Sequence, residues 1–166
     1  MSLRIGILGA SRIAESAIVE PAHELGHRLV AVAARDPLRA EIFAEKYGVD
    51  RVVPTYQDLV SDPEVDVIYN PLANALHAPW NLAAVAAGKP VLTEKPFARN
   101  REEAVRVANA AVTADITVME GFHYLFHPVN QRALSVARDG TIRWMGVQDP
   151  DALDSAWGLP VAAETA

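Results

Sequence analysis

The sequence predicts an α/β fold, a doubly wound parallel sheet with helices on both of its faces. Two observations lead to this prediction. Short apolar runs alternate along the chain with longer stretches of helical periodicity, which is the pattern of successive β-α-β units. The apolar runs also lack the polar alternation of a half-exposed strand, so each strand should be buried on both faces, as in a parallel sheet.

The composition limits what the chain can be. Its 166 residues suffice for one domain with at most a short appendage, and 51% of them are hydrophobic, as in a packed globule. The net charge of −6 comes without a basic cluster, which argues against nucleic acid or an anionic membrane as a partner. Cysteine is absent, so disulfides and thiolate-ligated zinc are excluded, and no apolar run reaches the roughly 18 residues of a membrane-spanning helix. We therefore expect a cytoplasmic protein.

Five continuous apolar runs are the predicted strands. They cover residues 3–8, 28–34, 65–69, 90–93 and 116–119. A shorter run at residues 51–53 is a candidate for an extra strand.

Helical patterns fill the intervals between these runs. One helix is predicted over residues 37–47, closed by Gly48 as its C-cap, and another over residues 80–87, followed by Gly88. The first of these should bury one stripe of side chains, made of Leu38, Ile42, Phe43 and Tyr47.

A third helix is predicted over residues 101–114. Asn100 is its expected N-cap, and two glutamates lie in its first turn, where the helix dipole favours negative charge. The apolar side chains that should face the sheet are Ala104, Val105, Ala108, Ala111 and Val112.

A loop of small residues follows the first predicted strand and leads into a helix. It comprises Gly9, Ala10, Ser11, Arg12, Ile13 and Ala14. A dinucleotide-binding loop needs a glycine for the tight turn, a small second residue beside the pyrophosphate and a small third residue for helix packing, and Gly9, Ser11 and Ala14 supply these. A small-residue turn without a ligand stays open from the loop alone. The order strand, loop, helix and second strand favours nucleotide binding and a Rossmann-type sheet.

The end of the second strand bears on which nucleotide is bound. A small residue, Ala34, is followed by Arg35, which leaves room for the extra phosphate of NADP and offers it a planar cation. This favours NADP, with NAD as the alternative. The other interpretation is that Arg35 is a solvated surface residue and that Asp36 caps the helix beginning at Pro37.

The fourth strand ends at Glu94, Lys95 and Pro96, where the carboxyl edge of an open sheet places its ligands. A lysine held beside a glutamate can exchange a proton with a substrate hydroxyl, and Glu94 can influence the charge state of Lys95. An ordinary ion pair at a strand end is the alternative, and the residues alone do not decide between the two.

Taken in order, several segments of the chain resemble the glucose-fructose oxidoreductase and inositol dehydrogenase (Gfo/Idh/MocA) family. They are residues 9–14, 35–37, 70–77 (NPLANALH), 94–96 (EKP) and 119–128 (MEGFHYLFHP). The resemblance covers residues 3 to about 145. It implies that the first half of a two-domain oxidoreductase, its NAD(P)-binding Rossmann domain, is present, and it points to the branch of dihydrodiol and glucose-type dehydrogenases that use NADP.

The resemblance also implies roles for individual residues. Lys95 is the expected catalytic lysine, acting during hydride transfer on a sugar, polyol or diol hydroxyl. His123 and Tyr124 are expected at the substrate pocket beside the nicotinamide. The other residues expected at the cofactor are Pro71, Leu72, Asn74, His77 and Glu94.

Two departures from the family pattern change these expectations. Leu125 stands where the family has an arginine. The family's second domain should begin near Thr141 and contribute an aspartate and a histidine to the proton relay, but the residues after Trp144 do not resemble it. We therefore predict a Rossmann domain over residues 1–125, and over residues 126–166 a linking helix, one strand at 141–148 and an irregular tail, with the substrate domain absent or truncated.

These departures leave alternatives to an active enzyme. The chain can be a cofactor-binding module without turnover that a partner chain completes, or a degenerate gene product with an exposed strand. The family commonly dimerises through the substrate domain, which we expect to be absent or truncated here. Whether identical chains assemble in another way therefore stays open. The histidines at positions 77, 123 and 127 lack ligand-type spacing, so no metal site is predicted.

Overall fold

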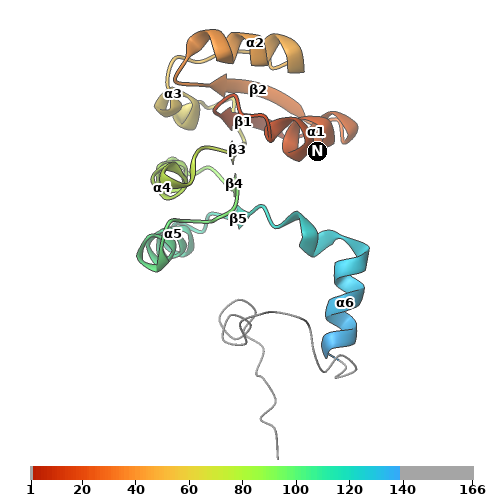
Figure 1. Cartoon of the computed structure of the whole chain (residues 1–166). Coiled ribbons are helices and arrows are strands. Elements are labelled where there is room, and N and C mark those ends of the chain that lie inside the picture. Colours follow the sequence, from red (N-terminus) through yellow and green to blue (C-terminus); the bar gives the residue numbers. More distant parts are fainter. Residues whose placement is uncertain (1, 139–166) are drawn as a thin grey trace, which may run out of the picture. The chain divides into compact units, whose positions relative to one another are not determined.

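The computed structural model describes residues 2–138, and their strands form one parallel sheet. The order across the sheet is β2-β1-β3-β4-β5, and every neighbouring pair is parallel, which confirms the predicted fold class (Figure 1). The strands are β1 (Arg4–Leu8), β2 (Arg28–Ala33), β3 (Val67–Asn70), β4 (Val91–Thr93) and β5 (Val118–Glu120).

Helices connect consecutive strands and continue beyond β5. The first connection is a π-turn, η1 (Glu15–Val19), that continues into α1 (Glu20–Glu24). The others are α2 (Pro37–Tyr47), α3 (Tyr56–Ser61), a 3-10 turn η2 (Asn74–Leu76), α4 (His77–Ala86) and α5 (Arg101–Ala114). A further 3-10 turn and helix follow, η3 (His123–Phe126) and α6 (Pro128–Arg138).

The core has two parts, one on each face of the sheet. On one face, Ile5 and Ile7 of β1 pack with Val19, Ala22 and Phe43 from η1, α1 and α2. A second set of buried side chains joins strand residues to α3 and α4, and Figure 1 shows α3, α4 and α5 along this side. Its members include Leu8, Val30, Leu59, Val60, Val65, Ile68, Ala84 and Val91. Helices on both faces make the sheet doubly wound.

Two elements differ from the sequence prediction. Residues 51–53 form only an isolated bridge, between Val52 and Val32, in place of a strand. Helix α3 was not predicted; it begins with a capping box in which Thr55 and Asp58 each bond the other's backbone N–H. Six residues are too few to show a helical period, so the cap is the main local signal for this helix.

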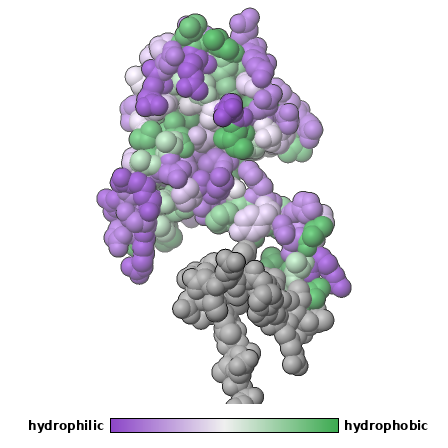
Figure 2. Space-filling model, in the orientation of Figure 1, coloured by the Kyte–Doolittle hydropathy of each residue, from purple (hydrophilic) through white to green (hydrophobic). Residues whose placement is uncertain are grey.

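The expected buried stripes of α2 and α5 are partly wrong. In α2, Leu38 and Ile42 are more than half exposed, and the helix packs through Ala40 and Phe43 instead. Hydrophobic surface is accordingly visible over α2 at the top of Figure 2. In α5 the buried side chains are Val107 and Glu103, whereas Val105 and Val112 are exposed.

The burial of Glu103 has a local cause. Its carboxylate accepts hydrogen bonds from the guanidinium and the backbone N–H of Arg99, while its own N–H donates to the N-cap Asn100. A buried carboxylate is tolerated where such bonds replace its hydration. The first turn of α5 is therefore held by polar contacts that override the apolar pattern.

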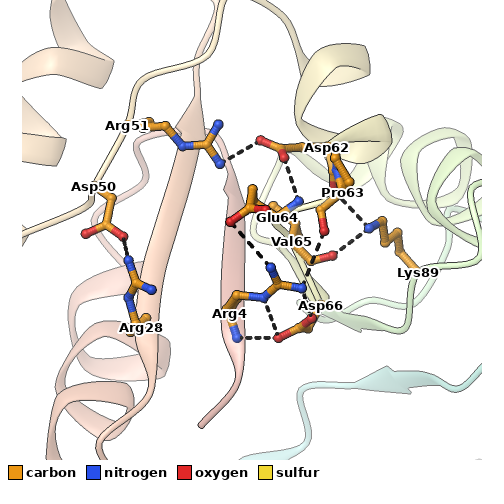
Figure 3. Close-up of polar contacts among 10 residues, drawn as sticks. All are labelled: Arg4, Arg28, Asp50, Arg51, Asp62, Pro63, Glu64, Val65, Asp66 and Lys89. Carbon is orange, nitrogen blue, oxygen red and sulfur yellow. Dashed lines mark hydrogen bonds and ion pairs between the residues drawn. The ribbon is translucent and has the colours of Figure 1, made fainter.

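A polar network lies at the edge of the sheet where the strands begin (Figure 3). Arg4 forms a two-pronged pair with Asp66, and Lys89 donates to the carbonyls of Asp62 and Val65 at 2.9 and 2.5 Å. Arg51 pairs with the buried Asp62 at 2.9 Å. These contacts tie β1 to the turns before β3 and β4, and they leave the carboxyl edge of the sheet free of this network.

Replacing Asp66 by asparagine should lower the free energy of unfolding at pH 7, and the difference from wild type should narrow in acid. The hydrogen bond from Arg4 holds the pKa of Asp66 below its ordinary value. Such a carboxyl stabilises the fold above its unfolded pKa of about 3.9, and it loses this contribution as the pH falls through its folded pKa. Urea unfolding at pH 7 and pH 3 measures both differences, and equal destabilisation at the two pH values would contradict the assignment.

The chain divides into two compact units, Met1–Phe122 and His123–Ala166. The first contains the whole sheet. Of the second, the structure describes η3 and α6, where the Asn130 side chain donates to the Tyr124 carbonyl at 3.0 Å. The predicted strand at 141–148 lies outside the described residues. No helix within residues 2–138 is long and apolar enough to cross a membrane.

Candidate functional site

A cleft of about 460 Å³ opens where β1, β2 and β3 end. Parallel strands present their carboxyl ends at one edge, and open α/β sheets bind ligands there. The predicted site residues that line this cleft are Gly9, Ala10, Ser11, Arg35, Pro71 and Leu72. Five segments of the chain meet in this cleft: the loop after β1, the end of β2, the first turn of α2, the start of α3 and the loop after β3.

Gly9 occupies a position that only glycine fits easily. Its φ is 87°, in the left-handed region, and its N–H donates to the Ala33 carbonyl of β2 at 2.6 Å. A Cβ built on Gly9 would lie 2.9 Å from Cδ2 of Leu72, which is a clash. The tight turn and the close approach of the opposite wall therefore both depend on the missing side chain.

Ser11 and Ala14 complete the turn into η1. Ala14 is fully buried in the first core, as expected for the small residue that lets the helix approach the sheet. The hydroxyl oxygen of Ser11 is buried, and it has no hydrogen-bond partner among residues 2–138. A buried hydroxyl without a partner costs free energy, and a phosphate oxygen is a group that would satisfy it. The loop therefore fits a phosphate-bearing ligand.

Two arginines line the same cleft, on the side formed by β2 and α2. Arg35 follows β2 after one residue, Ala34, and Arg39 lies in the first turn of α2, where its guanidinium donates to the Ala10 carbonyl at 3.0 Å. Asp36 caps α2 by accepting from the Leu38 N–H, as the sequence predicted. Sequence analysis missed Arg39, and Arg35 precedes the N-cap of α2, so no helical spacing between the two arginines was available as a signal.

The remaining wall is apolar and aromatic. It includes Tyr56, which stacks edge-to-face on Trp80 of α4 with the ring centroids 5.1 Å apart. Ala73 and Leu76 follow Leu72 along the same wall. Tyr56 is the first residue of α3, and this helix places it at the cleft. Because α3 was not predicted, the sequence did not identify Tyr56 as a site residue.

Lys95 is exposed after β4 and does not line the cleft. Glu94, by contrast, is buried, and its carboxylate accepts a hydrogen bond from the Tyr69 hydroxyl at 2.9 Å. Burial, and next the charge of Glu94, raise the pKa of Tyr69 above its ordinary value, so that this hydroxyl stays protonated. Among residues 2–138 no ion pair joins Glu94 to Lys95, so the ordinary ion pair considered from the sequence is not formed. Glu94 instead fixes the backbone that carries Lys95.

Some residues of the 70–77 segment line the cleft, and others do not. Pro71 and Leu72 line the cleft, but Asn74 is exposed and does not, and His77 is only 1% exposed. The ring of His77 lies between two backbone carbonyls, that of Leu72 and that of Pro96. A direct contact between His77 and a ligand is therefore incompatible with its burial.

Three loop residues beside Ser11 have different positions. Ala10 lines the main cleft, whereas Arg12 lines a smaller cavity of about 200 Å³ between the loop and α2. Ile13 is 46% exposed. His123 and Tyr124 lie in η3, in the second unit, and both are exposed there. Their expected place at a substrate pocket stays a prediction, and residues 2–138 hold no group of three or more metal-ligating side chains.

Comparison with known proteins gives one family. Residues 3–122 match the GFO_IDH_MocA model, described as an oxidoreductase family with an NAD-binding Rossmann fold. The chain is 36% identical over 131 residues to D-xylose 1-dehydrogenase (NADP(+)) 2 of Haloferax volcanii, covering 79% of this chain and 40% of that protein. It is also 36% identical over 144 residues to the mouse trans-1,2-dihydrobenzene-1,2-diol dehydrogenase, covering 86% of this chain and 43% of that one. The chain thus spans about two fifths of the length of these curated relatives.

Solved structures give the same result. The crystal structure of KijD10, a 3-ketoreductase from Actinomadura kijaniata in complex with NADP and TDP-benzene, matches with a TM-score of 0.76 and 34% identity. The match covers 86% of this chain and 44% of that one.

Proposed function

The chain belongs to the Gfo/Idh/MocA oxidoreductase family, and from this we propose that its cleft binds NADP for hydride transfer on a sugar, polyol or diol hydroxyl. The observation that carries the proposal is the joining of the Gly9–Ser11 turn to Arg35 and Arg39 in a single cleft. The cleft offers the Ser11 hydroxyl, which is buried without a partner among the described residues, and the guanidinium groups of Arg35 and Arg39. NADP has a pyrophosphate and an adenosine phosphate to match these two kinds of donor.

The turn and the two arginines would hold different parts of the cofactor. The turn at Gly9, Ala10 and Ser11 would receive the pyrophosphate, with the Ser11 hydroxyl as an added donor. Arg35 and Arg39 would hold the phosphate on the adenosine ribose, which NAD lacks. Ala34, the residue after β2, has no carboxylate to bond a free ribose hydroxyl, and this favours NADP. The similar xylose dehydrogenase is described as an NADP(+) enzyme and KijD10 was solved in complex with NADP, and both support NADP over NAD for this chain.

Lys95 is the residue that we propose for proton transfer. When bound, the cofactor supplies the hydride acceptor or donor at its nicotinamide ring. The Lys95 ammonium or amine returns or takes the proton of the substrate hydroxyl, and its place after β4 puts it at the ligand-binding edge of the sheet. Glu94, held by Tyr69, fixes the backbone from which Lys95 extends.

Turnover of NADP with a panel of sugars, polyols and diols tests this function, and Lys95→Met tests the assigned residue. Removal of a proton-transfer group should slow turnover by about 10²–10⁴-fold. The affinity for NADPH should stay unchanged, because Lys95 does not line the cleft. Lys46→Met, on α2 outside this cleft, is the matched control and should keep full activity.

A cofactor-binding module without turnover is the second candidate function. The observation that favours it is that Lys95 is exposed and is not among the residues that line the cleft. NADPH binding without turnover on any member of the panel would support this candidate and contradict the first. The domain division at residues 1–125 and 126–166, the cytoplasmic location and assembly of identical chains remain our predictions.

A further inference from the structure

The ring of His77 is buried between two backbone carbonyl groups from different loops. Its Nδ1 lies 2.6 Å from the Pro96 oxygen, and its Nε2 lies 2.7 Å from the Leu72 oxygen. His77 is the first residue of α4 and is 1% exposed, so water does not compete for either nitrogen. The side chain thus bridges the loop after β3 and the loop after β4.

The chemistry of the two partners decides the form of the ring. A carbonyl oxygen only accepts hydrogen bonds, and a neutral imidazole carries one N–H, so it can satisfy only one of the two. The second ring nitrogen would then point a lone pair at an oxygen in a buried site, which is unfavourable. The doubly protonated imidazolium donates to both carbonyls.

The charged surroundings of His77 can balance such a cation. Glu120, at the end of β5, is partly buried, and the nearby His77 counters the effect of burial, which raises the Glu120 pKa. Its carboxylate also accepts the Phe97 N–H at 2.6 Å, next to the Pro96 carbonyl that His77 binds. The loop after β4 contributes Glu94, which is bonded to Tyr69, and the exposed Lys95; the loop after β3 and the first turns of α4 contribute no other titratable side chain.

We propose that His77 is a positioning residue, an imidazolium that joins the wall of the cofactor cleft to the segment that carries Lys95. Leu72 lies in the cleft wall opposite Gly9, and Pro96 directly follows Lys95. The bridge therefore sets where the lysine lies relative to the bound cofactor. That functional consequence rests on the proposed function, whereas the protonation and the bridge do not.

The backbone at His77 is itself held firmly. The side-chain amide of Asn70, at the end of β3, donates to the His77 carbonyl at 3.3 Å and to Oδ1 of Asn81 at 2.8 Å, and Asn70 and Asn81 are fully buried. The first turn of α4 is thus attached to the sheet, and the ring projects from a fixed point. A rigid support is what a positioning residue requires.

The protonation is measured directly on the cofactor-free chain. Long-range ¹H–¹⁵N spectra of ¹⁵N-histidine-labelled protein at pH 7 distinguish an imidazolium, with two protonated nitrogens, from either neutral tautomer. The resonances are assigned by replacing His23, His27, His123 and His127 one at a time, because none of these is buried. Two protonated nitrogens for His77 are expected. One unprotonated nitrogen would overturn the proposal.

The bridge is measured by amide hydrogen exchange in His77→Gln, with His23→Gln, at an exposed position of α1, as the matched control. The variant should exchange faster at residues 72–76 and 96–98 than wild type, while β1 and α2 keep their protection. Unchanged exchange in either segment would overturn the bridge. Uniformly faster exchange would also overturn it, because it would mean general destabilisation.

The functional consequence has its own readout. Since the cleft wall would have to be ordered on binding, His77→Gln should bind NADPH about tenfold more weakly, which corresponds to about 1.4 kcal/mol. If wild type does not bind NADPH, the proposed function fails while the two cofactor-free measurements still decide the bridge. If wild type binds and His77→Gln binds equally well, the positioning role is wrong.

Discussion

Gly9→Ala should weaken NADPH binding by about 10–100-fold, which corresponds to about 1.4–2.7 kcal/mol. The new Cβ would lie 2.9 Å from Cδ2 of Leu72, so the Leu72 side chain in the cleft wall would have to shift. The left-handed φ of 87° adds backbone strain of about 1–3 kcal/mol in a residue with a side chain. Both effects fall on the loop that would hold the pyrophosphate. Calorimetric titration with NADPH measures the loss.

Gly26→Ala is the matched control for this substitution. Gly26 has a φ of 70°, so alanine meets similar backbone strain there, but nothing lies within 4 Å of the added Cβ and the residue is outside the cleft. It should lower stability and leave NADPH affinity intact. Equal NADPH affinities for Gly9→Ala and Gly26→Ala would show that the turn at Gly9 does not hold the cofactor.

The double substitution Arg35→Ala, Arg39→Ala should abolish a preference for NADPH over NADH. A charged hydrogen bond to a phosphate contributes about 1.5–3 kcal/mol, so the loss of both arginines should weaken NADPH binding by about 100-fold or more. NADH lacks that phosphate, and its affinity should change little. The measurement is a pair of titrations at one salt concentration, because added salt screens exposed charges.

Arg28→Ala is the control for the arginine variant. Arg28 is as positively charged but lies where β2 begins, at the other edge of the sheet, and pairs with Asp50. Its removal should leave both affinities unchanged. Parallel losses of NADPH and NADH affinity in the double variant would mean that the arginines hold a part common to both cofactors, and the assignment of the adenosine phosphate would be wrong.

The sheet was predictable because β1 to β4 are largely buried and therefore appear as apolar runs. The expected burial on both faces is wrong for the edge strand β5, where Met119 is 42% exposed. The helix faces were less predictable, since burial there depends on partners. Leu38 and Ile42 have the right spacing for a core stripe, yet the sheet does not reach them, and Ala40 packs in their place. Glu103 is buried because its carboxylate is hydrogen-bonded to Arg99, and a pattern of apolar residues does not predict such a pair.

Some residues of the candidate site could likewise be predicted from the sequence, and others could not. Gly9, Ser11 and Arg35 lie next to the strand ends that position them, so local order in the sequence was enough to identify them as candidates. Tyr56 reaches the cleft from α3, which the sequence did not reveal. The two acceptors of His77 come from loops 5 and 19 residues away, and only the fold brings both to one ring.

The central claim is that this cleft binds NADP, and calorimetric titration of the purified chain with NADPH and, separately, with NADH tests it most directly. Micromolar binding with a preference for NADPH is the expected result, and it would justify the substrate panel and the variants at Gly9, Arg35 and Arg39. If neither NADPH nor NADH binds, the claim is contradicted, because the polar and charged groups of the cleft would then not hold a nicotinamide cofactor.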